Sequence, residues 1–270
     1  MTLNDNLTHA LNGGVGGIIS RTTTAPLELL KIYKQNDYLF KSTNFFNIIK
    51  NEGVFSLWKG NLTNCIRIFP NSAINFMTFN YSKKYIQNLN YQFNDKIINL
   101  SCGTISGIAA TTFTYPLDNA RTRLTTQVNN NNYNNIYDVF KKTSIKNLYN
   151  GYRMTLCGFV PYNSLNFMFY NIYKNYNIVN NQNINNLISG GIAGMSAVSI
   201  TYPTDLIRRR LQMQDLHNNI IKYNGIIDCI KKIYNIDGII GFYKGLGYCY
   251  IKIFPSMAIQ FCIVDYFKKN

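Results

Sequence analysis

The stretch GGVGGIISRTTTAPLELLK, residues 13–31, decides the fold because it occurs three times in this 270-residue chain. Its counterparts are CGTISGIAATTFTYPLDNAR at 102–121 and GGIAGMSAVSITYPTDLIRRR at 190–210. When Pro26, Pro116 and Pro203 are aligned, a glycine stands thirteen and nine residues before each proline. An acid follows each proline by two residues and a base by five. Agreement at four offsets in three places indicates an internal repeat.

A second motif follows each copy of the first. GNLTNCIRIFPNSAINF, GYRMTLCGFVPYNSLNF and GLGYCYIKIFPSMAIQF align on Pro70, Pro161 and Pro255. Each repeat therefore predicts a long helix, a polar loop with a short amphipathic helix, and a second long helix. The expected long helices are 6–36, 62–87, 94–124, 153–176, 184–213 and 247–268, and the expected repeats are residues 1–90, 91–179 and 180–270.

Hydropathy alone does not identify these helices as transmembrane, because no stretch of about 20 residues is free of polar groups. Only 14% of the residues are charged, however, and the net charge is +15. Glycines four residues apart form a small-xxx-small pattern, which allows close helix packing in lipid. The remaining faces carry Phe, Ile, Tyr and Leu. We therefore expect an all-α membrane protein with six transmembrane helices in three hairpins. The alternative is helix packing in a soluble repeat protein.

The repeated motifs resemble the signature of the mitochondrial carrier family, P-x-[DE]-x-x-[KR]-x-[KR] and then [DE]-G-x4-[WYF]-[KR]-G. PLELLKIY, PLDNARTR and PTDLIRRR match the first part, and EGVFSLWKG (52–60) and DGIIGFYKG (237–245) match the second. Tyr33 stands where a second base is usual, and the middle loop, IKNLYNG (145–151), lacks the acid and the glycine. The resemblance implies a pseudo-threefold bundle around a central cavity, with short amphipathic helices on the matrix side. It also implies two alternating gates and a multi-pass location in the mitochondrial inner membrane, with another organelle membrane left open.

Acids and bases just after the aligned prolines predict a gate at the matrix end of the bundle. Charges inside a bundle are costly unless they are paired, so three acid–base pairs could link in a ring. The alternative is a local bridge within each helix. Pro26, Pro116 and Pro203 are expected to kink their helices toward one end of the bundle. The predicted gate residues are Glu28, Lys31, Asp118, Arg121, Asp205 and Arg208, with Gln35 and Gln212 resembling the bracing glutamines of the family and Thr125 in the middle place.

The opposite, cytoplasmic gate is predicted near the ends of the second helices of the repeats. In the family it uses [FY]-[DE]-x-x-[KR], and here the matching segments are FNYSK (79–83), YNIYK (170–174) and VDYFK (264–268). Lys83, Lys174, Asp265 and Lys268 remain, whereas Asn80 and Asn171 replace two acids. The sequence therefore predicts a weak cytoplasmic gate and a resting carrier that is open to the outside.

Polar residues recur at spacings of three, four and four on these second helices, which keeps them on one helix face. In the first repeat they are Asn64, Arg67, Asn71 and Asn75. Arg67, Gly158 and Lys252 stand three residues before their prolines and match the three substrate contact points of the family. The two bases can hold phosphate oxygens, unless they snorkel to lipid headgroups. The predicted substrate-binding residues are Arg67, Gly158, Phe159, Lys252, Arg21, Asn71, Asn75, Tyr162 and Ser256.

Gly158 and Phe159 are expected to leave a gap with an apolar wall for a flat base, on which Tyr162 could stack. SRTTTAP, GNLTNCIRIFP and YPTDLIRRRLQ look similar to the branch of the family that carries adenine nucleotides, ATP-Mg/phosphate and coenzyme A. We therefore expect a secondary transporter that exchanges a phosphorylated, nucleotide-like anion. The alternatives are a carrier of a different small anion and a non-transporting adaptor.

The expected partners are the anionic substrate and membrane lipid, cardiolipin among the candidates, and the expected state is a monomer. The sequence has two His and no C-x-x-C, so we expect no metal site. No nucleophile–base constellation predicts a catalytic residue, so we expect neither an enzyme nor a cofactor. The bases are not gathered on one solvated face, which argues against a nucleic-acid partner.

Overall fold

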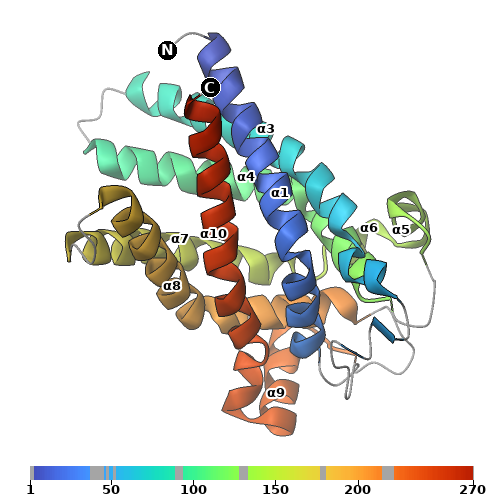
Figure 1. Cartoon of the computed structure of the whole chain (residues 1–270). Helices are drawn as coiled ribbons and strands as arrows, with labels where there is room; N and C mark the ends of the chain where they lie inside the picture. The colour runs from blue at the N-terminus through green and yellow to red at the C-terminus, as the bar shows by residue number, and fades with distance from the viewer. Residues whose placement is uncertain are drawn as a thin grey trace.

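The structure is a computed structural model of a helical bundle (Figure 1). It describes residues 3–36, 46, 49–50, 53–88, 94–127, 133–176, 181–214 and 222–269, with side chains except in 3–13, 96, 183 and 260–269. The long helices are α1 (Leu3–Gln35), α3 (Asn61–Asn88), α4 (Asp95–Thr125), α7 (Tyr152–Asn175), α8 (Gln182–Met213) and α10 (Leu246–Lys269). The short elements are η1 (Val54–Trp58), α5 (Ile136–Lys142), α6 (Ile145–Leu148), α9 (Ile226–Asp237) and η2 (Ile239–Tyr243).

The all-helical prediction is confirmed, and no strand occurs in the described ranges. Each long helix begins and ends within three residues of the bounds expected from the repeat. The Asn-rich loop at 129–132 lies outside the described residues.

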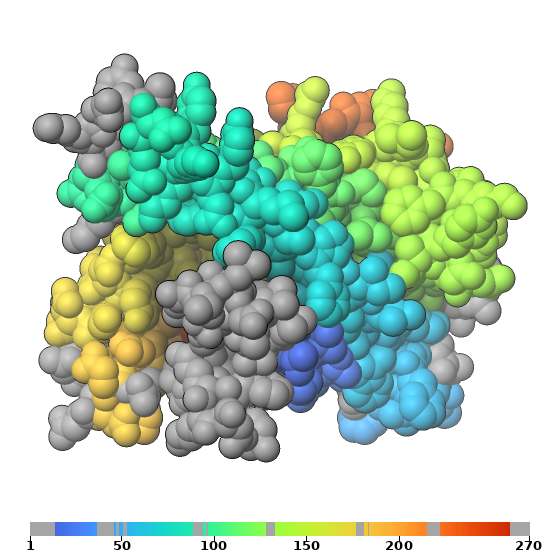
Figure 2. All heavy atoms as spheres, turned by 90° about the horizontal axis from the view of Figure 1, so that it is seen from above, coloured from blue at the N-terminus to red at the C-terminus, as the bar shows by residue number. Residues whose placement is uncertain are grey.

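The bundle packs most closely between repeats: α3 lies on α4, α7 on α8, and α10 on α1. Both chain termini lie at one end, which we call the terminal end, while α5, α6 and α9 lie toward the opposite one, the loop end (Figure 1). Seen from above, the atoms of α5 and α6 lie on one side and the start of α8 on the other (Figure 2). Among the first helices of the repeats, α8 contacts both α4 and α1, and these three helices carry the predicted matrix gate.

The bundle exposes many apolar side chains and buries several charged ones, which is the reverse of the usual pattern in a soluble protein. Every long helix exposes large apolar side chains, such as Ile19, Phe76, Phe113, Phe167, Ile200 and Ile251, whose exposed fractions lie between 44% and 71%. Carboxylates and guanidinium groups are buried instead, Asp118 and Arg209 among them. One helical stretch of the described chain, Ile97–Thr125, is long and apolar enough to cross a membrane by composition. The exposed apolar surface therefore suits lipid rather than water.

The aligned prolines lie inside three long helices: Pro26 in α1, Pro116 in α4 and Pro203 in α8. A proline at position 26 cannot donate to the carbonyl of Thr22. The indole Nε1 of Trp58 donates to this carbonyl instead, at 2.8 Å. The hydroxyl of Tyr149 does the same for the carbonyl of Thr112, four residues before Pro116, at 3.2 Å. Aromatic residues at the equivalent place in the second part of the signature thus satisfy two of the carbonyls that the prolines leave free.

Three equivalent glycines bring each second helix against a neighbouring repeat: Gly60, Gly151 and Gly245, whose φ angles are 77°, 83° and 90°. Such positive φ values favour glycine. A Cβ on Gly151 would also lie 2.8 Å from the carbonyl oxygen of Arg208, and one on Gly60 would lie 3.0 Å from that of Arg121. The second helices therefore start directly against the backbone of the gate bases.

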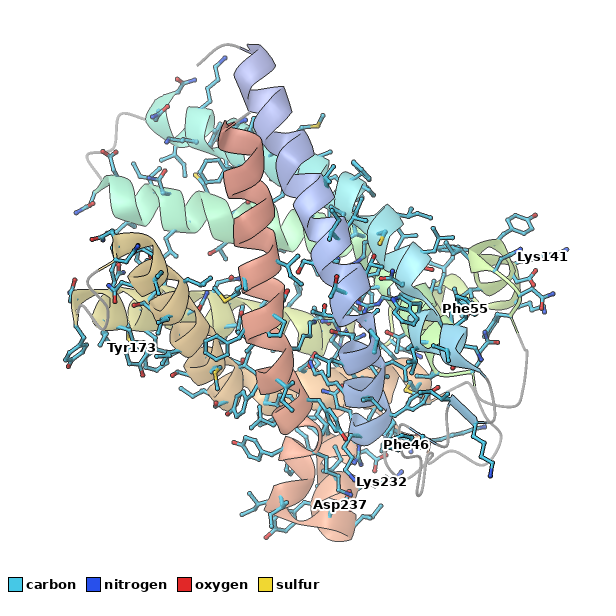
Figure 3. All side chains as sticks on the ribbon, viewed as in Figure 1. Phe46, Phe55, Lys141, Tyr173, Lys232 and Asp237 are labelled. Carbon is cyan, nitrogen blue, oxygen red and sulfur yellow. The ribbon has the colours of Figure 1, made fainter. Side chains whose placement is uncertain are left out.

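Asp237, at the end of α9, is the acid in the second part of the signature. It contacts two bases that also belong to the signature. Its carboxylate accepts from Arg210 at 3.2 Å and from Lys244 at 2.7 Å, at the tip of the loop end (Figure 3). The middle repeat lacks this acid, and there Arg123 Nε donates to Asn119 Oδ1 at 2.8 Å. The departure in the middle repeat thus falls where another polar group takes the place of the acid.

Asp237→Asn is expected to lower the free energy of unfolding by about 2 kcal/mol, because Arg210 is buried and loses its charged partner. Burial alone would raise the pKa of Asp237, but hydrogen bonds from Lys244 and Arg210 outweigh it and hold the pKa below its ordinary value. A lowered folded-state pKa contributes stability above the unfolded pKa of about 4 and loses it as pH falls.

The measurement is the melting midpoint of the purified carrier in detergent between pH 7 and pH 3. Between pH 7 and pH 3 the melting midpoint of the wild type should fall by more than that of Asp237→Asn. Asp95→Asn, at an exposed carboxyl, is the matched control and should follow the wild type. Equal falls of the melting midpoint in the wild type and Asp237→Asn would contradict the role of Asp237 as the charged partner of Arg210 and Lys244.

Candidate functional site

Six charged residues on the first helices of the repeats form one ring of ion pairs toward the loop end. Lys31 Nζ lies 2.7 Å from Asp205 Oδ2, Arg121 Nη2 lies 3.7 Å from Glu28 Oε1, and Arg208 pairs with Asp118. Each pair joins two helices, namely α1 to α8, α4 to α1 and α8 to α4. The pairs therefore cross between repeats and are not the local bridges that the sequence left open.

Two of the three pairs are supported by a glutamine, as the resemblance implies. The side-chain amide of Gln35 donates to Asp205 at 3.1 Å, and that of Gln212 donates to Asp118 at 3.2 Å. Thr125 occupies the third equivalent position, but among the described residues its hydroxyl donates to two backbone carbonyls, those of Lys59 and Arg121. The pair of Glu28 and Arg121 thus has no support from this position.

Glu28 is shared among several bases. It accepts a hydrogen bond from Lys252 Nζ, and its Oε1 lies 3.7 Å from Arg121 and 4.0 Å from Arg209. Lys252 was predicted to hold the substrate, and in this structure it is hydrogen-bonded to Glu28, a predicted gate acid. This corner of the ring therefore connects the predicted gate to the predicted substrate contacts.

A cavity of about 370 Å³ adjoins the ring and contains the predicted cations. Its lining has six bases and two acids: Arg21, Arg67, Arg121, Arg208, Arg209, Lys252, Glu28 and Asp118. Arg67 Nη2 lies 3.9 Å from Asp118 Oδ1. Arg67 and Lys252 thus point into the bundle together rather than toward lipid headgroups. Because bases outnumber acids, we call this the basic cavity, and its field attracts anions.

A second cavity of about 250 Å³ lies between α7, α8, α1 and α10. Phe159, Tyr162 and Val198 contribute to its lining, and Arg208 lines both cavities. We call it the aromatic cavity. The gap expected at Gly158 is not empty, because a Cβ there would overlap the hydroxyl of Thr204. Glycine is therefore required at this position for packing of α7 on α8, and the room lies beside it.

The other predicted contact residues are engaged with neighbouring helices. Asn71 donates to Thr114 Oγ1 of α4 at 3.1 Å, and the hydroxyls of Ser256 and Ser20 lie 2.9 Å apart. Asn75 lines a third cavity of about 960 Å³, which Phe159 shares. Ser256 lines the basic cavity and Asn75 lines the third cavity, so the predicted contact residues are not all gathered on one cavity.

The predicted cytoplasmic gate is not assembled in the part of the chain that the structure describes. The ammonium of Lys83 lies 6.0 Å from the ring centroid of Phe79, and that of Lys174 lies 5.8 Å from that of Tyr170. Both contacts stay within one helix, and no ion pair between described side chains joins either lysine to another helix. The side chains of Asp265 and Lys268 lie outside the described residues.

Two residues of the site had no role assigned from sequence. Arg209 is only 5% exposed, donates to Thr122 Oγ1 at 2.6 Å and lies 3.5 Å from Asp118. Its sequence signal was the run of three arginines at 208–210. Asn64 accepts from both Arg21 and Arg121, and its only signal was its place in the polar stripe. No cluster of three metal-binding side chains occurs among the described residues.

A pseudo-threefold helical bundle with one end closed by ion pairs above a basic cavity defines a membrane carrier built from three repeats. A sequence model described as "Mitochondrial carrier protein" matches residues 4–90, 95–181 and 179–270. The chain therefore belongs to the mitochondrial carrier family. Members of this family are transporters, so the chain is a transport protein and not an enzyme.

Several curated proteins are similar along nearly the whole chain. A mitochondrial adenine nucleotide transporter of Arabidopsis thaliana is 34% identical over 95% of this chain and 84% of its own length. A chloroplastic/mitochondrial adenine nucleotide transporter of the same plant is 32% identical over 98% of this chain and 70% of its own length. Solute carrier family 25 member 16 of Homo sapiens is 32% identical over 96% of this chain and 86% of its own length.

Proposed function

We propose that this carrier exchanges a phosphorylated, nucleotide-like anion across the mitochondrial inner membrane by alternating access. The observation that carries the proposal is that Arg208 lines both the basic and the aromatic cavity. A nucleotide has a charged phosphate end and a flat base, and the two cavities suit these two ends. The names of two similar proteins, both adenine nucleotide transporters, support the same class of cargo.

The phosphate end can open the gate because it competes for the same bases. Lys252 is bound to Glu28, and Arg67 lies near Asp118. Phosphate oxygens in the basic cavity accept from these bases, and each charge-assisted hydrogen bond is worth roughly 1.5–3 kcal/mol. The acids of the ring then lose partners, which favours the state that is open at the loop end. The loop end would face the matrix and the terminal end the cytoplasmic side.

The same proposal includes the division into repeats 1–90, 91–179 and 180–270 and a monomeric carrier. Membrane lipid, such as cardiolipin, would surround it. The exposed apolar side chains of the long helices support the lipid contact.

The direct test is uptake by vesicles that contain the purified carrier. Labelled ATP, ADP, coenzyme A and phosphate are offered outside, with one unlabelled anion inside. We expect uptake of a nucleotide or coenzyme A that depends on the internal anion. Uptake of phosphate alone would overturn the nucleotide-like class, and no uptake of any anion would favour the non-transporting adaptor.

Asn80→Asp together with Asn171→Asp is expected to favour the state that is closed at the terminal end. The new carboxylates would stand three residues before Lys83 and Lys174, where the resemblance places gate acids. Two partly exposed ion pairs contribute roughly 1 kcal/mol each at most. The rate at which an impermeant thiol reagent labels Cys249, which lines the aromatic cavity, should therefore fall about three- to tenfold.

Asn88→Asp is the matched control, because it adds a carboxylate at the exposed end of α3 without a gate position. Labelling at the wild-type rate in the double variant would refute the weak cytoplasmic gate.

A further inference from the structure

One buried amide oxygen links the basic cavity to the gate. Asn64, on α3, is 4% exposed. Its Oδ1 accepts from Arg21 Nη1 of α1 at 2.8 Å and from Arg121 Nη1 of α4 at 3.1 Å. Two like charges from two other helices thus share one neutral acceptor. Without that acceptor, each guanidinium group would lose a hydrogen bond in a buried place, which is costly.

Both arginines line the basic cavity, but Arg121 also pairs with a predicted gate acid. Arg21 lines the basic cavity, where the anion is proposed to bind. Arg121 pairs with Glu28 at 3.7 Å, a longer distance than the 2.7 Å between Lys31 and Asp205. This corner also lacks the glutamine that supports the other two pairs, as described above. Asn64 therefore supports the corner that is held least firmly.

We propose that Asn64 is a positioning residue that couples the anion in the basic cavity to the gate pair of Glu28 and Arg121. The inference rests on the proposed function. An anion that accepts from Arg21 takes one of the two donors away from Asn64 Oδ1. The oxygen then accepts more strongly from Arg121, which weakens the hold of Arg121 on Glu28. The corner between α1 and α4 thus opens first when the cavity fills.

The side chain must be neutral and must accept for this coupling to work. A carboxylate at position 64 would pair with both arginines and compete with the anion for Arg21. An alanine would leave Arg21 without the contact that orients it. Both changes should weaken anion binding. Their effects on the closed gate should be opposite, because the carboxylate adds an ion pair with Arg121 and the alanine removes a hydrogen bond from it.

The test is a double-mutant cycle in reconstituted vesicles, with ATP and ADP as probes. Asn64→Ala is expected to raise the KM for the transported nucleotide about tenfold and also to lower the maximal rate per folded carrier, because the gate pair is no longer coupled to the anion. In the background of Arg21→Ala the same change should leave KM unaltered, because Asn64 acts through Arg21. Asn64→Asp should raise KM at least as much and also raise the melting midpoint.

The matched control is Asn61→Ala, one turn earlier on α3. Asn61 donates to Thr22 Oγ1 at 3.0 Å and contacts α1 without holding an arginine. Its change should leave KM unaltered in both backgrounds. A loss of folded carrier at unchanged KM in Asn64→Ala would instead indicate a structural role and overturn the proposal, as would equal rises in KM with and without Arg21.

Uptake by the wild type and the melting midpoints of the variants together distinguish a failure of this inference from a failure of the proposed function. If wild-type vesicles take up no phosphorylated anion, the proposed function and the anion-coupled role of Asn64 both fail. If uptake occurs but the melting effects of Asn64→Ala and Arg121→Ala add independently, only the coupling fails. Both the proposed function and the coupling are supported by three results together. Wild-type vesicles take up a phosphorylated anion, the melting effects of Asn64→Ala and Arg121→Ala are not additive, and Asn64→Ala leaves KM unaltered in the background of Arg21→Ala.

Discussion

Arg67→Ala and Lys252→Ala are each expected to lower nucleotide uptake by about 10- to 100-fold, and the double variant by about 100- to 10,000-fold. Each base supplies charge-assisted hydrogen bonds to the phosphate end, and each such bond is worth roughly 1.5–3 kcal/mol, or about one to two powers of ten. The two side chains line one cavity but pair with different acids, Asp118 and Glu28. Their contributions should therefore be largely separate.

Lys252→Ala should have the larger effect of the two. Lys252 is hydrogen-bonded to Glu28, so its removal leaves a less neutralised carboxylate facing the cavity. That carboxylate repels the incoming anion, and this repulsion adds to the loss of the attraction by Lys252. Arg67→Lys keeps the charge but not the forked donor geometry, so it should retain more uptake than Arg67→Ala.

The measurement is the initial exchange rate per folded carrier in vesicles. Arg153→Ala is the matched control, because Arg153 is an exposed base at the start of α7. It removes the same charge without touching either cavity and should leave the rate near that of the wild type. Transport at the wild-type rate by the double variant would show that the anion binds elsewhere.

The bundle was predictable from the sequence because three copies give three independent views of each helix. Hydropathy would have failed, since a single described stretch, Ile97–Thr125, passes the membrane test. The common face of Arg67, Asn71 and Asn75 followed from their spacing alone. The roles of these residues in transport stay predictions.

Contacts between repeats could not be derived from spacing, because they depend on how closely the helices pack. The occupation of the room at Gly158 by Thr204 is one example. Another is Asn64, whose two partners lie on α1 and α4. A helical period shows which face a residue lies on, but not which side chain from another helix reaches it.

Reversal of the charges in the pair of Lys31 and Asp205 should have the second large effect, on both stability and transport. Asp205→Lys alone should lower the free energy of unfolding by roughly 3–5 kcal/mol, because it leaves a buried charge without its partner and adds a like charge. Lys31, at 11% side-chain exposure, lies 2.7 Å from Asp205 in the wild type. The loss should appear in the melting midpoint and as little or no exchange activity.

Lys31→Asp combined with Asp205→Lys should recover most of both properties, because it restores opposite charges between α1 and α8. Recovery will be incomplete, since Gln35 now donates to Asp205 and would face a lysine. A cross-helix ring predicts this rescue, whereas independent structural roles for the two residues predict that the double variant is worse than either single one.

The matched control is an exposed pair of the same length. Lys232, which is labelled in Figure 3, and Asp228 of α9 also lie 2.7 Å apart, at positions i and i+4 of one helix. Asp228→Lys should hardly move the melting midpoint, because water already solvates both charges. If Asp205→Lys proved as harmless as Asp228→Lys, the ion pairs would not hold the loop end closed. If it proved harmful but were not rescued, Asp205 would act through groups other than Lys31.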